Sequence, residues 1–213
     1  MAITFVDRQD AGKQLADKLA AYRNHHNAIV IGLPRGGVIP AAEVAKELKL
    51  PLDIVVPRKI GAPFNSELAV GAVTQDGQVV WNEKLMKSFH LSPDALDLKE
   101  TIKKERAESN RRLRLYRRGR PPLVLKDKTV IIVDDGIATG ATMRAAIAYA
   151  KQQGAAKIIA ATPVATVGTL ELIAPEVDEI ISVKLPKTFL GISAFYDTFG
   201  QTSDDEVIAL LSE

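Results

Sequence analysis

A short apolar run followed directly by two acids and a glycine–threonine loop, Val130 to Thr142, constrains the fold of this chain more than any other segment. Its first four residues, Val130 to Val133, are β-branched, which is typical of a strand buried on both faces of a parallel sheet. Asp134 and Asp135 end the run, and a helical pattern of apolar residues follows the loop as far as Gly154. The segment therefore predicts a strand, a loop and a helix in that order.

The same segment has the chemistry of a sugar-phosphate site. Backbone N–H groups of a glycine loop and of a helix N-terminus bind anions. Carboxylates repel an anion, so we expect Asp134 and Asp135 to hold vicinal hydroxyl groups or a metal ion on another part of the same ligand. On the pattern alone, paired acids after a strand are also compatible with a Mg²⁺ site of the response-regulator or phosphatase kind, or with an exposed strand end.

Over its whole length, Val130 to Thr142 resembles the binding motif for 5-phosphoribosyl-1-diphosphate (PRPP) in type I phosphoribosyltransferases. The resemblance implies that Asp134 and Asp135 bind the ribose hydroxyls and take part in holding Mg²⁺, directly or through those hydroxyls and water. It also implies that the loop binds the 5′-phosphate. The loop residues that it assigns to the substrate are Gly136, Ala138, Thr139, Gly140, Ala141 and Thr142.

A second strand–loop–helix unit precedes the first one in the chain. Ala28 to Gly32 is an apolar run that leads into Leu-Pro-Arg-Gly-Gly, and a helical pattern follows. Glycines allow the backbone to approach a ligand closely, and the Arg35 guanidinium matches phosphate oxygens. The family resemblance implies that this loop, with Gly36 and Gly37, holds the pyrophosphate of PRPP, often with a cis peptide bond.

The next predicted strand, Leu52 to Val56, is followed by the basic residues Arg58 and Lys59. These resemble a basic pair that other family members place near the pyrophosphate, and the alternative is a solvated pair at a strand end. Gly61 to Ser66 is rich in turn residues and is predicted to be an unburied loop. Its position resembles that of the flexible loop which closes over PRPP in the family.

The ends of the chain and its middle are predicted to surround this core. We expect an outer helix without chemistry from Asp7 to about Tyr22, a hairpin from Ala69 to Trp81, and a long helix from Ser92-Pro93 to about Tyr116. A cluster of arginines at the end of that helix indicates a solvated face or a subunit contact, with nucleic-acid binding as the alternative. Its members are Arg111, Arg112, Arg114, Arg117, Arg118 and Arg120.

After the last core strand, the resemblance implies a small hood that receives the acceptor. Phe189 and Tyr196 are the aromatic residues that we expect to contact it, and the alternative is a C-terminal mini-core. We therefore predict an α/β fold with a mostly parallel sheet flanked by helices, as a single domain over residues 1–213. Its parts are a core of about 1–80 and 123–185, a helical insertion of about 82–120 and a hood segment of about 186–213.

Composition excludes several other classes of protein. The chain has 213 residues, no cysteine and a formal net charge of +2, so thiol chemistry is excluded and charge alone does not indicate nucleic acid. No apolar stretch approaches the ~20 residues that span a bilayer, so we expect no membrane partner and a cytoplasmic location.

The sequence most resembles uncharacterised phosphoribosyltransferase-like proteins with a Pro-Arg-Gly-Gly loop and a long inserted helix. The resemblance implies Mg²⁺-dependent transfer of the phosphoribosyl group from PRPP to an acceptor, which we expect to be a nucleobase, with release of pyrophosphate. Arg35, Lys59 and the acids Asp134 and Asp135 are the predicted catalytic residues. A homodimer is expected. The alternatives are a PRPP-sensing regulator that binds nucleic acid and a hydrolase of PRPP or a ribose phosphate.

Overall fold

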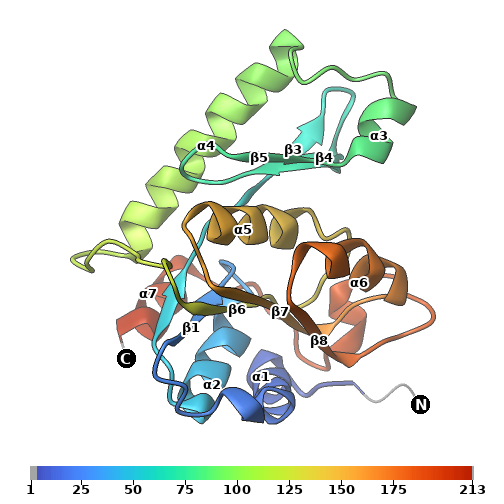
Figure 1. Ribbon diagram of the computed structural model, residues 1–213. Coiled ribbons are helices and arrows are strands. Elements are labelled where there is room, and N and C mark those ends of the chain that lie inside the picture. The colour runs from blue at the N-terminus through green and yellow to red at the C-terminus, as the bar shows by residue number, and fades with distance from the viewer. Residues whose placement is uncertain (1–3, 213) are drawn as a thin grey trace.

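The computed structural model describes residues 4–212, and these residues form a parallel sheet and a smaller antiparallel sheet (Figure 1). The parallel sheet has five strands in the order β2-β1-β6-β7-β8. These strands are β1 (Ala28–Gly32), β2 (Leu52–Ile54), β6 (Thr129–Val133), β7 (Lys157–Val164) and β8 (Glu179–Lys184). Every residue of β1 and β6 is buried, which confirms the prediction of a parallel sheet covered on both faces.

The side chains of each strand point alternately to the two faces of the parallel sheet. Both faces therefore carry apolar side chains, and helices cover both of them. Val30 and Ile131 point to one face, where they pack with α1 (Arg8–Lys18) and α2 (Val38–Leu48). The other face of β1 and β6 packs against α5 (Ala141–Gln152), and α6 (Val167–Ile173) lies on the same side (Figure 1). Two 3-10 helices, η1 (Ala20–Tyr22) and η2 (Ala174–Glu176), follow α1 and α6.

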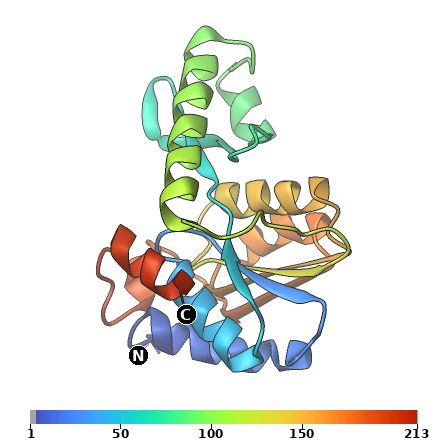
Figure 2. The same cartoon turned by 90° about the vertical axis from the view of Figure 1, so that its left-hand side faces the viewer.

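The antiparallel sheet belongs to a separate layer that we call the antiparallel subdomain, residues 58–116. Its strands are β3 (Arg58–Ala62), β4 (Asn65–Val73) and β5 (Val79–Trp81), and its helices are α3 (Glu83–Ser88) and α4 (Leu96–Tyr116). Ile60, Val70 and Leu98 are buried together between this sheet and α4. In Figures 1 and 2 the subdomain lies beyond α5, and α4 returns from it to the core beside α7 (Asp204–Ser212).

Three predictions about this region were wrong. Residues from 58 to about 80, which we assigned to the core, belong to the antiparallel sheet instead, although the predicted hairpin from Ala69 to Trp81 is present as β4 and β5. The predicted loop Gly61 to Ser66 is a tight hairpin between β3 and β4, in which register shifts around Gly61 accommodate the turn residues; residues 63–66 are exposed, as predicted. The long helix begins at Leu96, because the Ser92 hydroxyl accepts a hydrogen bond from Asp94 N–H (3.2 Å) in a turn that precedes it.

Strand β2 also ends earlier than predicted, at Ile54 instead of Val56. It lies at the edge of the sheet beside β1, and the pairing of the two strands ends where Gly32 lies opposite Ile54. Val55 and Val56 are nevertheless buried, at 1% exposure each, so their apolar character reflects core packing beyond the strand. An apolar run therefore identified the buried segment correctly but gave the wrong end for the strand.

The N-terminal segment pairs with the segment around Tyr196 beside the parallel sheet. Phe5 and Tyr196 form an isolated parallel bridge, just after the 3-10 helix η3 (Ile192–Phe195). Ser203 and Glu206 form a capping box: Ser203 N–H donates to the Glu206 carboxylate (2.7 Å), and Glu206 N–H donates to the Ser203 hydroxyl (3.1 Å). Asp204, the first residue of α7, lies 3.6 Å from Arg35, which follows the carboxyl end of β1. Within residues 4–212, no helix is long and apolar enough to cross a membrane.

Candidate active site

The topology of the parallel sheet brings two loops together. In the sheet order, β2 lies on one side of β1, and the strands that follow later in the chain lie on the other side. In sheets of this kind, ligands bind at the carboxyl ends of the strands where the order reverses. Here that point lies between β1 and β6, which are followed by the Pro-Arg-Gly-Gly loop and by the acids Asp134 and Asp135.

The two loops are in direct contact through glycine and carboxylate. A Cβ atom placed on Gly36 would lie 2.2 Å from Oδ2 of Asp135, and one on Gly37 would lie 2.7 Å from Oδ1 of Asp134. Only glycine at both positions allows the acids to approach the loop backbone this closely. The peptide bond between Pro34 and Arg35 is cis. The segments that the sequence analysis assigned to ribose and to pyrophosphate therefore form one continuous surface.

The acid pair lies in an environment that opposes its negative charge. Burial, together with the charge of Asp135 beside it, raises the pKa of Asp134 well above the ordinary aspartate value. Burial also raises the pKa of Asp135, although the Arg8 guanidinium acts in the opposite direction. One oxygen of Asp134 accepts a hydrogen bond from Asp135 N–H (2.9 Å). Buried carboxylates of this kind need hydrogen-bond donors or cations to offset the cost of burial.

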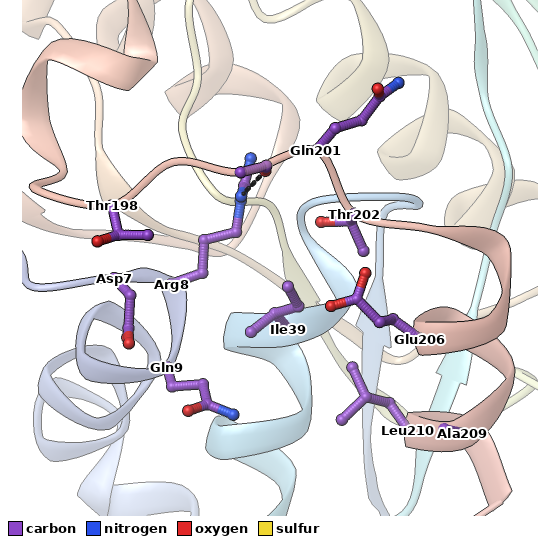
Figure 3. Close-up of a pocket in the computed structure, with 11 residues that line it drawn as sticks. Asp7, Arg8, Gln9, Ile39, Thr198, Gln201, Thr202, Glu206, Ala209 and Leu210 are labelled. Carbon is purple, nitrogen blue, oxygen red and sulfur yellow. Dashed lines mark hydrogen bonds between the residues drawn. The ribbon is translucent and has the colours of Figure 1, made fainter.

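Arg8, at the start of α1, is a site residue that the sequence analysis missed. Its Nε donates to Oδ2 of Asp135 at 2.7 Å. Its NH1 donates to the carbonyl of Gly200 at 2.8 Å, the bond drawn as a dashed line in Figure 3. Arg8, the first residue of α1, thus contacts the acid pair, although the sequence analysis predicted an outer helix without chemistry. A signal was available, because Arg8 lies at helical spacing from Ala11 and Leu15 on the buried face of the helix.

The predicted 5′-phosphate loop has the geometry of an anion site. Ala138 and Thr139 are exposed, and Gly140 is the N-cap of α5 with a φ angle of 78°, in the left-handed region that favours glycine. The carbonyl of Ala138 accepts a hydrogen bond from the Thr169 hydroxyl (2.9 Å), which ties the loop to α6. Ala141 and Thr142 form the first turn of α5, so free helix N–H groups face the loop.

A cavity of about 420 Å³ opens beside the acid pair. Asp135, Arg35 and Gly36 line one side of it, and the C-terminal segment, Phe199 to Thr202, lines another. A neighbouring cavity of about 410 Å³ shares Arg8 and part of the C-terminal segment with it (Figure 3). Figure 3 shows Ile39, Glu206 and Leu210 around this second cavity.

The other predicted substrate residues lie outside these cavity walls. Arg58 donates to Glu105 of α4 at 2.9 Å, and Lys59 is half-buried on β3. Phe189 packs on Phe195, with ring centroids 5.4 Å apart. Tyr196 is buried, and its hydroxyl donates to the backbone carbonyl of Asp135, so its ring is unavailable to stack on an acceptor. The aromatic residues of the hood thus form the mini-core that we considered as the alternative.

Acids neutralise much of the predicted arginine cluster. Arg111 and Arg112 both donate to Glu108 at 2.7 Å, and Arg117 pairs with Asp53 at 2.7 Å. The hydrogen bond from Arg111, helped by that from Arg112, lowers the pKa of Glu108 to about 2 against the opposing effect of burial. These pairs favour a structural role for the cluster, and nucleic-acid binding stays an untested alternative.

The donor set at the acid pair fits a metal ion that is shared with a ligand. Among residues 4–212, no group of three or more His, Asp and Glu side chains could hold a metal ion. Mg²⁺ is commonly bound by one or two carboxylates together with substrate phosphates and water, and does not require a cage made only of protein groups. Asp134 and Asp135 can supply carboxylate oxygens in this way, because Arg8 binds only one of the two Asp135 oxygens.

The parallel sheet with its two loops at the switch point has the fold of type I phosphoribosyltransferases. A family model for the phosphoribosyl transferase domain matches residues 5–190, and the chain belongs to this family. The crystal structure of the protein TT1426 from Thermus thermophilus is similar over 98% of this chain and 97% of that chain, with 38% identity and a TM-score of 0.82.

Curated relatives give the same family. Two proteins from Mycobacterium tuberculosis strains, provisionally named phosphoribosyl transferases, are 44% identical to this chain over 207 residues. The matched part is 97% of this chain and 46% of each relative, so the chain spans about half the length of the curated relatives it matches.

Proposed function

We propose that this chain binds PRPP with Mg²⁺ and transfers its phosphoribosyl group to a nucleobase acceptor, releasing pyrophosphate. The observation that carries the proposal is the contact between the two loops. Gly36 lies against Asp135 and Gly37 lies against Asp134, which supports a site in which the two predicted anion-binding loops flank the carboxylate pair. A ligand with a phosphate at one end, a pyrophosphate at the other and two hydroxyls between them matches this order of groups.

Each end of PRPP has a partner in this arrangement. The exposed loop of Ala138 and Thr139, with the N-terminus of α5, would bind the 5′-phosphate through backbone N–H groups. Asp134 and Asp135 would accept hydrogen bonds from the ribose hydroxyls, which offsets the cost of their burial. The guanidinium of Arg35 lies 3.6 Å from Asp204 and is 30% exposed, so it can also reach an anion in the cavity.

The reaction breaks the bond between ribose C1 and the pyrophosphate oxygen and forms a bond between C1 and an acceptor nitrogen, which loses its proton to solvent. Positive charge develops on the sugar and negative charge on the leaving group, as in glycoside cleavage. The carboxylates of Asp134 and Asp135 would stabilise the sugar cation, while Arg35 and the N–H groups near Gly36 would stabilise the pyrophosphate. Mg²⁺ bound with PRPP would supply further neutralisation of the leaving group.

The acceptor would lie in the cavities beside the C-terminal segment. Thr202 lines both cavities, and its buried hydroxyl has no hydrogen-bond partner among residues 4–212. An unsatisfied buried hydroxyl is costly, and a ligand that supplies its partner removes that cost. Neutral hydrogen-bonding groups of this kind suit a nucleobase.

The test is a calorimetric titration of PRPP with Mg²⁺ into the wild type and the double variant Asp134→Asn with Asp135→Asn. We expect the double variant to lose at least about 100-fold in affinity, since hydrogen bonds to charged groups contribute about 1.5–3 kcal/mol each. Asp94→Asn with Asp97→Asn, at exposed positions of the antiparallel subdomain, makes the same charge change and should bind normally. Equal affinity in all three proteins would refute the site.

Product analysis then separates transfer from hydrolysis. Incubation with PRPP and individual nucleobases should release pyrophosphate only when the correct base is present. Ribose 5-phosphate that accumulates at the same rate without a base would show hydrolysis in place of transfer.

A further inference from the structure

The buried face of α1 begins with a charged residue that has three different partners. Besides its hydrogen bonds to Asp135 and to the Gly200 carbonyl, the Arg8 guanidinium lies 3.7 Å from the ring centroid of Phe199. Arg8 is 9% exposed. One side chain thus connects the acid pair to the C-terminal segment, Phe199 to Thr202, although 127 residues separate Arg8 from Asp135.

Stability alone gives little reason for this arrangement. A buried ion pair is commonly no more stabilising than apolar side chains of similar volume, because both charges lose their hydration. The other residues of the buried face of α1 are Ala11, Gly12, Leu15 and Ala16, which pack without charge. A planar guanidinium, however, can donate in two fixed directions and stack on an aromatic ring at the same time.

We propose that Arg8 is a positioning residue that orients the carboxylate of Asp135 toward the ribose hydroxyls and holds the C-terminal segment over the substrate cavity. The proposal rests on the proposed function, because it assigns Asp135 to the ribose. Oδ2 of Asp135 is fixed between Arg8 and the backbone of Gly36, so its position depends on the Arg8 hydrogen bond. The same guanidinium holds Gly200 and Phe199, which line the cavity beside Asp135.

This role predicts an effect that depends on the part of the substrate that is bound. Loss of Arg8 should weaken ligands that carry the ribose, namely PRPP and ribose 5-phosphate. Pyrophosphate, which would bind at the Pro-Arg-Gly-Gly loop without contacting Asp135, should keep its affinity. A purely structural loss would weaken all three ligands together.

The experiment compares Arg8→Gln and Arg8→Lys with Arg117→Gln as the matched control. Arg117 forms a buried pair with Asp53 at the same 2.7 Å distance, with both side chains 12% exposed, away from the acid pair. The dissociation constants of PRPP, ribose 5-phosphate and pyrophosphate are measured calorimetrically for each protein. Hydrogen exchange of residues 198–202 is followed by mass spectrometry without ligand, and circular dichroism checks that each variant is folded.

We expect Arg8→Gln to bind PRPP and ribose 5-phosphate at least about tenfold more weakly, with pyrophosphate unchanged and faster exchange in residues 198–202. Arg8→Lys keeps the positive charge but loses the planar set of guanidinium donors. Compared with Arg8→Gln, it should therefore regain part of the affinity for ribose-containing ligands and little of the protection from exchange. Arg117→Gln should bind all three ligands as the wild type does.

Three results would overturn the inference. PRPP affinity of Arg8→Gln equal to that of the wild type would show that Arg8 does not position Asp135. An equal loss for all three ligands would show a general structural defect. If the wild type binds pyrophosphate and ribose 5-phosphate but Arg8→Gln leaves the exchange of residues 198–202 unchanged, Arg8 does not hold the segment. Absence of PRPP binding by the wild type would instead refute the proposed function itself.

Discussion

Two buried ion pairs join helices to the parallel sheet, one at the acid pair and one at the junction with the antiparallel subdomain. Arg8 meets Asp135 at 2.7 Å with side-chain exposures of 10% and 12%, and Arg117 meets Asp53 at 2.7 Å with 12% and 12%. The two pairs differ in how many carboxylate oxygens accept a hydrogen bond from the arginine. Both oxygens of Asp53 accept hydrogen bonds from Arg117, whereas Arg8 reaches a single oxygen of Asp135.

In our proposal, the Arg117–Asp53 pair stabilises the fold, and the Arg8–Asp135 pair serves ligand binding. Asp53 also accepts from the backbone N–H of Ile54 (2.8 Å), so its hydrogen-bonding capacity is largely used within the protein. Asp135 lines a cavity and carries a pKa raised by burial, so it has both the access and the energetic reason to bind a ligand. Distance and burial alone do not distinguish the two pairs.

Breaking the pair at the junction should have the largest effect on stability. Arg117→Gln leaves the carboxylate of Asp53 buried without its bidentate partner, which typically costs about 3 kcal/mol. We expect urea unfolding to show a loss of this size, with PRPP affinity unchanged. A loss of PRPP affinity without a loss of stability would reverse the roles that we assign to the two pairs.

The acids of the two pairs should respond in opposite ways to the same substitution. Asp135→Asn removes a charge that burial opposes, which offsets the loss of the ion pair with Arg8, so the melting temperature should be maintained while PRPP affinity falls by about 2 kcal/mol. Asp53→Asn should lower the melting temperature and maintain PRPP affinity. Thermal melts and calorimetry on both variants test this crossed pattern, and parallel changes in the two proteins would contradict it.

A smaller effect should follow from moving the Asp135 carboxylate without removing it. Gly36→Ala places a Cβ atom 2.2 Å from Oδ2 of Asp135, so the carboxylate must shift, and we expect about a tenfold loss of PRPP affinity. Gly168→Ala is the matched control, because a Cβ there meets no atom within 4 Å. Equal calorimetric affinities for the two variants would show that the contact between the loops is not needed for binding.

Local patterns in the sequence predicted most of the parallel core. Strand β1 has the predicted ends, Ala28–Gly32, because the apolar run that defines it is a local signal. The two loops were found for the same reason, since each follows directly on a buried strand. Patterns of this kind act within a few residues, and sequence analysis detects them well.

The parts that sequence missed depend on contacts between distant residues. Gly61 to Ser66 has the turn residues of a loop, but the pairing of β3 with β4 makes it a hairpin. Arg8 could be placed on the buried face of α1, yet its partners Asp135 and Gly200 are set by the tertiary fold. Tyr196 was assigned to the acceptor for its ring, while the structure uses its hydroxyl to support the Asp135 backbone.

The central claim is that the two loops form one PRPP site, and a calorimetric competition experiment tests it most directly. Pyrophosphate and ribose 5-phosphate should each bind in the presence of Mg²⁺, and saturating PRPP should displace both of them. Arg35→Gln should weaken pyrophosphate more than ribose 5-phosphate. PRPP that binds without displacing either ligand, or that does not bind at all, would contradict the account.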